Sequence, residues 1–183
     1  EASGLLTSKK DAAGKSVSYT YLTGGKLASR TWARVNGTNS LATTYSYADS
    51  GDLTGLDYSD STPDVTFTVD RLGRQKTAES SVSAHTFAYN GLLLDTETIV
   101  SDAGTNVIDR SYDAYGRPTG FTLGDDYVVR YGYDSFGRFS MVSNFVLSAF
   151  SAVNYSYLSG SDLLSGYTLG DLTVSRTYEQ NRN

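Results

Sequence analysis

The feature that most constrains this chain is an internal repeat, because a repeat dictates an architecture before any single residue does. Residues 112–117 read Tyr-Asp-Ala-Tyr-Gly-Arg, and residues 133–138 read Tyr-Asp-Ser-Phe-Gly-Arg. A weaker copy, Val-Asp-Arg-Leu-Gly-Arg, occupies residues 69–74. Each copy places an aromatic or β-branched residue, which we call the lead residue, four positions before a glycine that is followed by arginine.

The same spacing recurs about every 22 residues along the whole chain. Copies with a glycine start at Tyr21 and Tyr47, and Gly4 fits the glycine position of an earlier copy. Three further lead residues precede turns without that glycine; they are Tyr89, Tyr157 and Tyr178, with Leu93, Ser161 and Arg182 at the glycine position. The positions to which we assign a structural role in the repeat are Tyr21, Gly25, Tyr47, Gly51, Val69, Gly73, Arg74, Tyr89, Tyr112, Asp113, Gly116, Arg117, Tyr133, Asp134, Gly137, Arg138, Tyr157 and Tyr178. We predict a single array of about eight repeats over residues 1–183, without a linker or a second domain.

The residues before each turn alternate between large and small polar side chains, which is the pattern of a half-buried β-strand. Val17, Tyr19 and Tyr21, for example, share one face of such a strand. The same alternation occurs at residues 41–47, 65–69, 127–133, 153–157 and 172–178. Second strands follow the turns, as at residues 121–123 and 139–142, and return turns are predicted at residues 36–37, 60–63, 124–126 and 170–171 from their Gly and Asx content.

Two strands and two turns account for a period of about 22 residues. The predicted fold class is therefore all-β, built from antiparallel β-hairpin repeats. About sixteen strands exceed the roughly ten that an open, twisted sheet holds before it curls. We expect a curved, spirally wound sheet, that is, a shell or solenoid, in which the tyrosines of successive repeats stack as ladders.

Composition excludes several chemistries. The chain has no cysteine and only one histidine, which rules out a thiol nucleophile, a disulfide framework and a metal site rich in cysteine or histidine. Twenty acidic and 15 basic residues give a net charge of -5, which disfavours a nucleic-acid partner. No apolar run is long enough to span a bilayer. We expect no catalytic, cofactor-binding or metal-binding residue.

The Tyr-Asp-x-x-Gly-Arg core with its Tyr-x-Tyr lead-in, clearest at residues 112–117 and 131–138, resembles the YD repeat of the RHS-repeat family. The resemblance implies a large secreted or surface protein whose repeats wind a β-sheet into a hollow shell. In insecticidal toxin complexes and bacterial competition effectors the shell encloses a toxic C-terminal segment, whereas wall-associated proteins and teneurins use similar repeats in adhesion. The family's self-cleaving core segment has no match here. Because both ends cut a repeat, we expect the chain to be a piece of a longer polypeptide or a unit whose ends pair with neighbouring chains.

Two rows of charged residues recur in the repeat and admit a second interpretation. The acidic row, which could be a calcium ladder but which we expect to open turns, is Asp70, Asp113 and Asp134. The basic row, which could be an anion-binding stripe but which we expect to pair with an aspartate of a neighbouring repeat, is Lys26, Arg74, Arg117 and Arg138.

Aromatic residues outside the lead positions are the better candidates for exposed contacts, since lead tyrosines are expected to stabilise the sheet. These candidates are Trp32, Tyr58, Tyr115 and Phe136. His85 lies in a strand pattern, and we expect a surface or ladder-edge role for it rather than catalysis.

The sequence therefore favours a non-catalytic structural segment of a secreted or cell-surface RHS/YD-repeat protein, part of a β-sheet shell around a cargo or toxin. One alternative is a surface adhesin module that binds glycans or a partner protein. Another is a fibre subunit that assembles by edge-to-edge strand pairing. Expected partners are neighbouring repeats of the same polypeptide or other copies of the chain, with a possible enclosed cargo or glycan.

Overall fold

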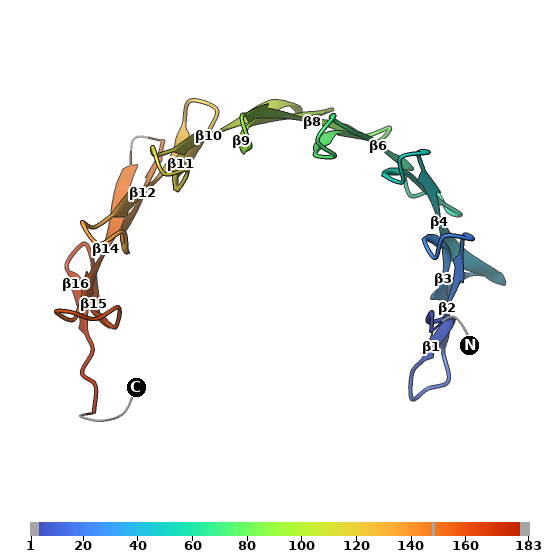
Figure 1. Ribbon diagram of the computed structural model, residues 1–183, viewed down its shortest axis with the longest axis horizontal. Helices are drawn as coiled ribbons and strands as arrows, with labels where there is room; N and C mark the ends of the chain where they lie inside the picture. The colour runs from blue at the N-terminus through green and yellow to red at the C-terminus, as the bar shows by residue number, and fades with distance from the viewer. Residues whose placement is uncertain (1–3, 148, 180–183) are drawn as a thin grey trace. The chain divides into compact units, whose positions relative to one another are not determined.

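The computed structural model describes residues 4–147 and 149–179, and over these residues it contains β-strands and turns but no helix (Figure 1). The strands are β1 (Ser8–Lys10), β2 (Ser16–Tyr21), β3 (Leu27–Asn36), β4 (Asn39–Tyr47), β5 (Leu53–Tyr58), β6 (Val65–Val69), β7 (Gln75–Glu79), β8 (Ser83–Asn90), β9 (Leu93–Ser101), β10 (Gly104–Tyr112), β11 (Pro118–Leu123), β12 (Tyr127–Tyr133), β13 (Phe139–Val146), β14 (Ala149–Tyr157), β15 (Leu164–Leu169) and β16 (Leu172–Ser175). The prediction of an all-β chain of hairpins is confirmed.

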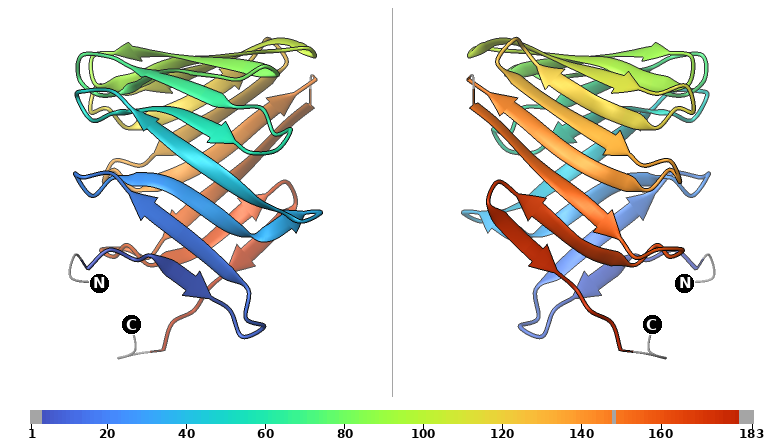
Figure 2. Two further views of the ribbon diagram at one scale, coloured as in Figure 1. Left: turned by 90° about the vertical axis from the view of Figure 1, so that its right-hand side faces the viewer. Right: turned by 90° about the vertical axis from the view of Figure 1, so that its left-hand side faces the viewer.

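Strand order in the sheet follows strand order in the chain, and neighbouring strands are antiparallel. The chain divides into two compact units, one of residues 1–87 and 99–105, the other of residues 88–98 and 106–183. In the first unit the strands from β1 to β8 are paired in succession, β1 with β2 and so on to β7 with β8. In the second unit the strands from β10 to β16 are paired in the same way, ending with β15 and β16. Figure 2 shows the turns of each unit alternating between the two ends of its strands.

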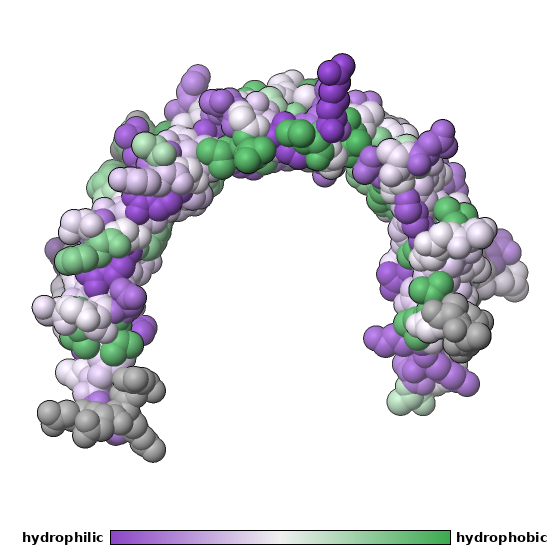
Figure 3. Space-filling model, in the orientation of Figure 1, coloured by the Kyte–Doolittle hydropathy of each residue, from purple (hydrophilic) through white to green (hydrophobic). Residues whose placement is uncertain are grey.

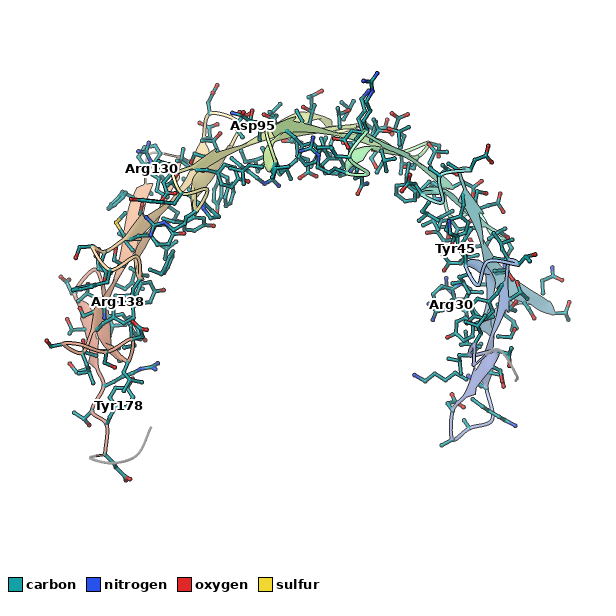
Figure 4. All side chains as sticks on the ribbon, viewed as in Figure 1. Arg30, Tyr45, Asp95, Arg130, Arg138 and Tyr178 are labelled. Atoms are coloured by element: carbon teal, nitrogen blue, oxygen red, sulfur yellow. The ribbon has the colours of Figure 1, made fainter. Side chains whose placement is uncertain are left out.

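The two faces of each unit differ in chemistry because side chains alternate along a strand. We call one face the tyrosine face; it carries Tyr19 and Tyr45 in the first unit and Tyr131 and Tyr155 in the second. The opposite face, which we call the hydroxyl face, is rich in serine, threonine and glycine. Exposure follows this alternation: in β2 the tyrosine-face residues are half-buried and the intervening residues are exposed. Figure 4 shows Arg30 and Tyr45 on the same side of the first unit.

The chain has almost no conventional core. Among the described residues only Val129 is a buried apolar side chain, at 7% exposure. The accessible surface is 12751 Å², whereas a compact monomer of 19.7 kDa has about 8,600 Å². Figure 3 accordingly shows hydrophobic and hydrophilic side chains interspersed over the surface in view. Each unit is a single-layer sheet in which side chains are partly buried by the side chains of neighbouring strands in the same layer.

Aromatic contacts between neighbouring strands supply much of this burial in the second unit. The ring of Phe139 contacts those of Tyr131, Tyr133 and Tyr155, with centroids 5.8, 5.9 and 5.6 Å apart. Tyr155 continues the series to Tyr167 at 6.3 Å. Such pairs contribute about 0.5–1.5 kcal/mol each beyond the area that they bury, and here they replace a second layer.

The predicted return turns at residues 60–63, 124–126 and 170–171 lie between strands, whereas of the turn predicted at residues 36–37 Asn36 is the last residue of β3 and Gly37 lies in the turn. Two other turns differ from expectation. The segment after Tyr89 was expected to turn around Leu93, but Leu93 begins β9; the connection is the tight Gly91-Leu92 turn, where Gly91 has φ of 58°. An unpredicted turn at residues 11–15 joins β1 to β2. Nowhere in the described ranges does a helix have the length and apolar character needed to cross a membrane.

Candidate functional site

The most regular constellation in the chain is the turn that follows each lead residue. In the Asp113 copy, the Asp113 amide donates to the Arg117 carbonyl at 3.0 Å, and the Gly116 amide donates to the Asp113 carbonyl at 2.9 Å. Gly116 has φ of 78°, a conformation that favours glycine because it lacks a Cβ. The copies that begin at Asp70 and Asp134 have the same two backbone bonds.

The aspartate side chain holds this turn from inside. One carboxylate oxygen of Asp113 accepts the amides of Tyr115 and Arg117 at 2.9 and 3.0 Å. The other accepts Nε of Arg117 at 2.7 Å. Asp134 has the matching partners, Phe136 and Arg138. These carboxylates are saturated by donors of their own turn, which is the turn-opening arrangement rather than a calcium ladder.

The third copy has the same geometry. Asp70 accepts the amides of Leu72 and Arg74 with one oxygen and the Arg74 guanidinium with the other. In the described part of the chain no group of three or more His, Asp or Glu side chains is placed to hold a metal ion.

The donors around these carboxylates shift their protonation equilibria. The Arg74 side chain, by its hydrogen bond, lowers the pKa of Asp70 below its ordinary value. At Asp113 and Asp134 partial desolvation raises the pKa, but the hydrogen bonds from Arg117 and Arg138 outweigh it, so that both pKa values are lowered. All three carboxylates therefore stay ionised to a lower pH than an ordinary aspartate does.

The basic residue of each turn also reaches the next repeat. The Arg117 guanidinium lies 4.3 Å from the Tyr133 ring centroid, and its Nη1 donates to the Gly137 carbonyl at 3.5 Å. Lys26 repeats this arrangement with Tyr47 at 5.2 Å and the Gly51 carbonyl at 2.7 Å. The next repeat thus offers these cations a ring and a carbonyl.

The expectation that these cations pair with aspartates of a neighbouring repeat is wrong in its main part. Each arginine binds the aspartate of its own turn instead, because four residues of turn bring the two side chains together. Arg138 also has an acidic neighbour in the next repeat, Asp162, at 3.9 Å. Arg138 otherwise follows the common plan, with the Tyr157 ring centroid at 4.4 Å and the Ser161 carbonyl as acceptor.

The lead tyrosines tie each hairpin to the one before it. The Tyr112 hydroxyl donates to the Leu94 carbonyl at 2.7 Å, and the Tyr133 hydroxyl donates to the Pro118 carbonyl at 2.9 Å. The further lead tyrosines with such a bond are Tyr21, Tyr47, Tyr157 and Tyr178, which donate to the carbonyls of Leu6, Leu27, Phe139 and Leu164. Val69 occupies the same position without a hydroxyl, and Arg182 lies outside the described residues.

Sequence reasoning missed a second set of glycines. Gly55, Gly120 and Gly166 lie on the strands after the turns, opposite the residue that precedes the lead tyrosine. A Cβ on Gly120 or Gly166 would overlap a carbonyl oxygen of the next strand. The signal was present in the sequence, since each glycine follows its lead tyrosine by eight or nine residues.

The turn at Asp11 was missed for a related reason. Asp11, Gly14 and Lys15 repeat the Asp-x-x-Gly-basic pattern, and the Asp11 carboxylate accepts the Lys15 amide at 2.8 Å. This turn has Lys10 at the lead position, so a search that starts from aromatic lead residues passes over it.

The aromatic candidates for exposed contacts fall into two classes. Tyr115 and Phe136 are 85% and 82% exposed and occupy the same position in successive turns. Trp32 and Tyr58 are half-buried. His85 is half-buried in β8 and its ring stacks on Phe87 with centroids 6.4 Å apart.

Comparison with known proteins gives likeness in fold only. No protein-family model and no curated protein sequence matches the chain. Solved structures do match. The chain is similar to the crystal structure of TcdB2-TccC3-Cdc42 with a TM-score of 0.68 and 13% identity, over 87% of this chain and 9% of that one.

A second match is the Photorhabdus luminescens Tc holotoxin pore with the mutation TccC3-D651A, at a TM-score of 0.71 and 13% identity over 87% of this chain and 9% of that one. A third is the crystal structure of TcdB2-TccC3 without the hypervariable C-terminal region, with a TM-score of 0.68 and 14% identity over 85% of this chain and 9% of that one. The chain therefore shares the all-β fold of about a tenth of a Tc toxin chain.

Proposed function

We propose that this chain is a non-catalytic structural segment of a larger secreted or cell-surface RHS/YD-repeat protein, in which it forms part of a β-wall that covers another polypeptide segment. The observation that carries the proposal is the interlocking of successive hairpins. The polar atoms of the recurring motif bind within their own turn or to a neighbouring hairpin, as in Asp113 with Arg117 and Tyr133 with Pro118. Groups engaged in this way hold a wall together and leave little for chemistry.

The likeness to Tc toxin structures supports the same proposal. It extends over 87% of this chain and does not depend on sequence similarity, which is 13%. The single-layer sheet supports it as well, because a layer with two accessible faces is suited to separate two spaces. The chain has no cysteine, so an oxidising extracellular environment would leave no thiol to react.

Site-directed photo-crosslinking in the native polypeptide that carries this segment tests the proposal. A photoreactive phenylalanine derivative replaces Tyr131, which lies on the tyrosine face of β12, or its chain neighbour Arg130, which lies on the hydroxyl face (Figure 4). If the tyrosine face covers a cargo, the label at residue 131 yields cross-linked peptides from a segment outside residues 1–183. The label at residue 130 does not. Equal yields, or cross-links from residue 130 alone, contradict the proposal.

A second function, glycan binding by an adhesin, is favoured by one specific observation. Tyr115 and Phe136 present exposed rings from successive turns of the repeat, each with the arginine of its own turn near it, at 5.3 and 5.1 Å from the ring centroid. Two strands separate these turns, so the turns are about 10 Å apart along the row of strand ends. Two exposed rings at this separation can stack on sugars of an extended glycan. A glycan array probed with the chain and with the variant Tyr115→Ala/Phe136→Ala tests this function: signals that persist in the variant exclude these rings as the binding site.

A further inference from the structure

The tyrosine face of the first unit carries a cluster of rings and cations that the repeat does not explain. Tyr19, Arg30, Thr43 and Tyr58 form a row across β2, β3, β4 and β5, each residue paired in register with the next. Trp32 joins this row from β3, where the register shifts between Thr31 and Val35. None of these residues belongs to the Asp-x-x-Gly-Arg turn.

A buried hydrogen bond fixes the position of the tryptophan ring. Its indole Nε1 donates to the hydroxyl of Thr43 at 3.0 Å, and Thr43 is only 2% exposed. On this anchored ring lies the Arg30 guanidinium, 3.7 Å from the ring centroid. Arg34 approaches the same ring at 5.4 Å, and Tyr19 lies 6.0 Å from Arg30. The guanidinium is therefore held by rings on a rigid strand.

Arg30 differs from Arg110, an arginine of the tyrosine face in the second unit, in having no carboxylate partner. Arg110, on the same face of the second unit, donates to the Glu97 carboxylate at 3.0 Å. Within the described ranges the Arg30 side chain makes no hydrogen bond or ion pair, and its Nε is buried without a partner. Arg110 also has one buried nitrogen without a partner, Nη1, but its Nη2 has the Glu97 carboxylate. The residues paired with Arg30 in register, Tyr19 and Thr43, are uncharged. A half-buried guanidinium without an acceptor is costly, and its fork of donors matches a carboxylate.

We propose that Arg30 and Trp32 form a binding site for a carboxylate side chain of an acidic polypeptide segment. The ring positions the guanidinium, and the guanidinium donates to the carboxylate. Arg34 adds a second positive charge, which also acts on the Asp60 carboxylate. That the partner is a polypeptide rests on the proposed function, in which the tyrosine face covers one. The carboxylate of the partner segment would take the place beside Arg30 that Glu97 has beside Arg110.

Fluorescence titration of the isolated chain tests the site directly, because Trp32 is the only tryptophan. The probes are a Glu/Gly peptide and a Gln/Gly peptide of equal length. We expect the acidic peptide to change the Trp32 emission saturably, with an affinity that falls as salt is added, and the neutral peptide to leave it unchanged. If the acidic peptide causes no saturable change in the Trp32 emission, the proposal is wrong.

The matched variants are Arg30→Gln and Arg130→Gln, which remove the same charge from the tyrosine face and from the hydroxyl face. We expect Arg30→Gln to weaken binding of the acidic peptide by about tenfold or more, and Arg130→Gln to change it less than about twofold. Equal losses in both variants mean non-specific charge attraction and overturn the site. Arg30→Lys, which keeps the charge and loses the fork, separates bidentate binding from attraction: full binding by this variant contradicts the bidentate geometry.

Two further arms identify the source of the anion. Inorganic phosphate or an acidic oligosaccharide that binds as tightly as the Glu/Gly peptide overturns the assignment to a polypeptide. Because these titrations use the chain alone, they are independent of the cross-linking that tests the wall. If the peptide binds but no cross-links to another segment form, the carboxylate site stands and the β-wall function is wrong. If cross-links form but the peptide does not bind, the β-wall function stands and the carboxylate site is wrong.

Discussion

At the scale of single residues, the charged pair of each turn is a local device. The aspartate of the Asp113 turn accepts two amides and one guanidinium, so its ionised form is bound more strongly than its protonated form. The same holds for Asp70 and Asp134, whose pKa values are also lowered. Stability linked to these groups depends on pH in one direction only.

The pH prediction follows from that direction. Because the pKa in the folded state lies below the unfolded value of 3.8, the contribution is complete above that value and is lost as the pH falls through the lower, folded pKa. The variant Asp70→Asn/Asp113→Asn/Asp134→Asn should be less stable than the parent at pH 7 and should lose less on acidification to pH 3. Urea midpoints at the two pH values measure this. Asp125→Asn, in an exposed turn, is the control. A variant that loses as much as the parent contradicts the linkage.

A second prediction at this scale concerns the glycine that lies against the next strand. Gly120 has φ of 148°, and a Cβ there would overlap the Val129 carbonyl oxygen. Gly120→Ala should destabilise the second unit by about 1–3 kcal/mol. Gly24→Ala, where φ is ordinary and no atom lies within 4 Å of the added Cβ, should be close to neutral. Chemical denaturation of the two variants measures the difference, and equal effects would refute the close-approach explanation.

At the scale of the hairpin, the lead tyrosine adds a side-chain hydrogen bond between strands of successive hairpins that the ladder already pairs. Tyr133 ends β12, and its hydroxyl reaches the carbonyl of Pro118 at the start of β11. A register shift between Gly132 and Tyr133 accompanies this reach. The bulge and the hydroxyl together orient one hairpin against the next.

Tyr133→Phe should therefore cost about 0.5–1.5 kcal/mol, because it deletes one hydrogen bond and leaves the ring in place. Tyr131→Phe is the matched control, since Tyr131 lies in the same strand and its ring packs on Phe139 without this bond. Thermal unfolding of the two variants compares them. A larger loss from Tyr131→Phe would show that the hydroxyl of Tyr133 does not join the hairpins.

The sequence predicts features that neighbouring residues determine better than features that depend on contacts between strands. Alternation located strands such as β2 and β12, and Asx and glycine clusters located turns, because both signals are local. The hydrogen bond of the Tyr133 hydroxyl to Pro118 and the contact of Arg117 with the Tyr133 ring depend on how neighbouring strands are placed, which periodicity alone does not specify. The Trp32 cluster was beyond prediction for the same reason, since three separate strands supply Tyr19, Trp32 and Thr43.

At the scale of the whole molecule, stability is a chain of neighbour contacts rather than a shared core. Each strand pairs with its neighbours in sequence, and Val129 is the single buried apolar residue in the described ranges. In such an array the stability of a segment depends on that segment and on the interfaces that flank it. A local defect should therefore remain local.

Hydrogen exchange in Gly120→Ala measures this locality. We expect the amides of β11 and β12 to lose protection most, those of β14 to lose less, and those of β2 to β4 in the first unit to exchange as in the parent, because no pairing of β11 or β12 reaches those strands. Exchange of Gly24→Ala sets the background for an alanine in a hairpin turn of the first unit. If Gly120→Ala accelerated exchange equally in all strands, the molecule would unfold as one cooperative body, and the wall would owe its stability to long-range coupling rather than to the Tyr and Arg contacts between neighbouring hairpins.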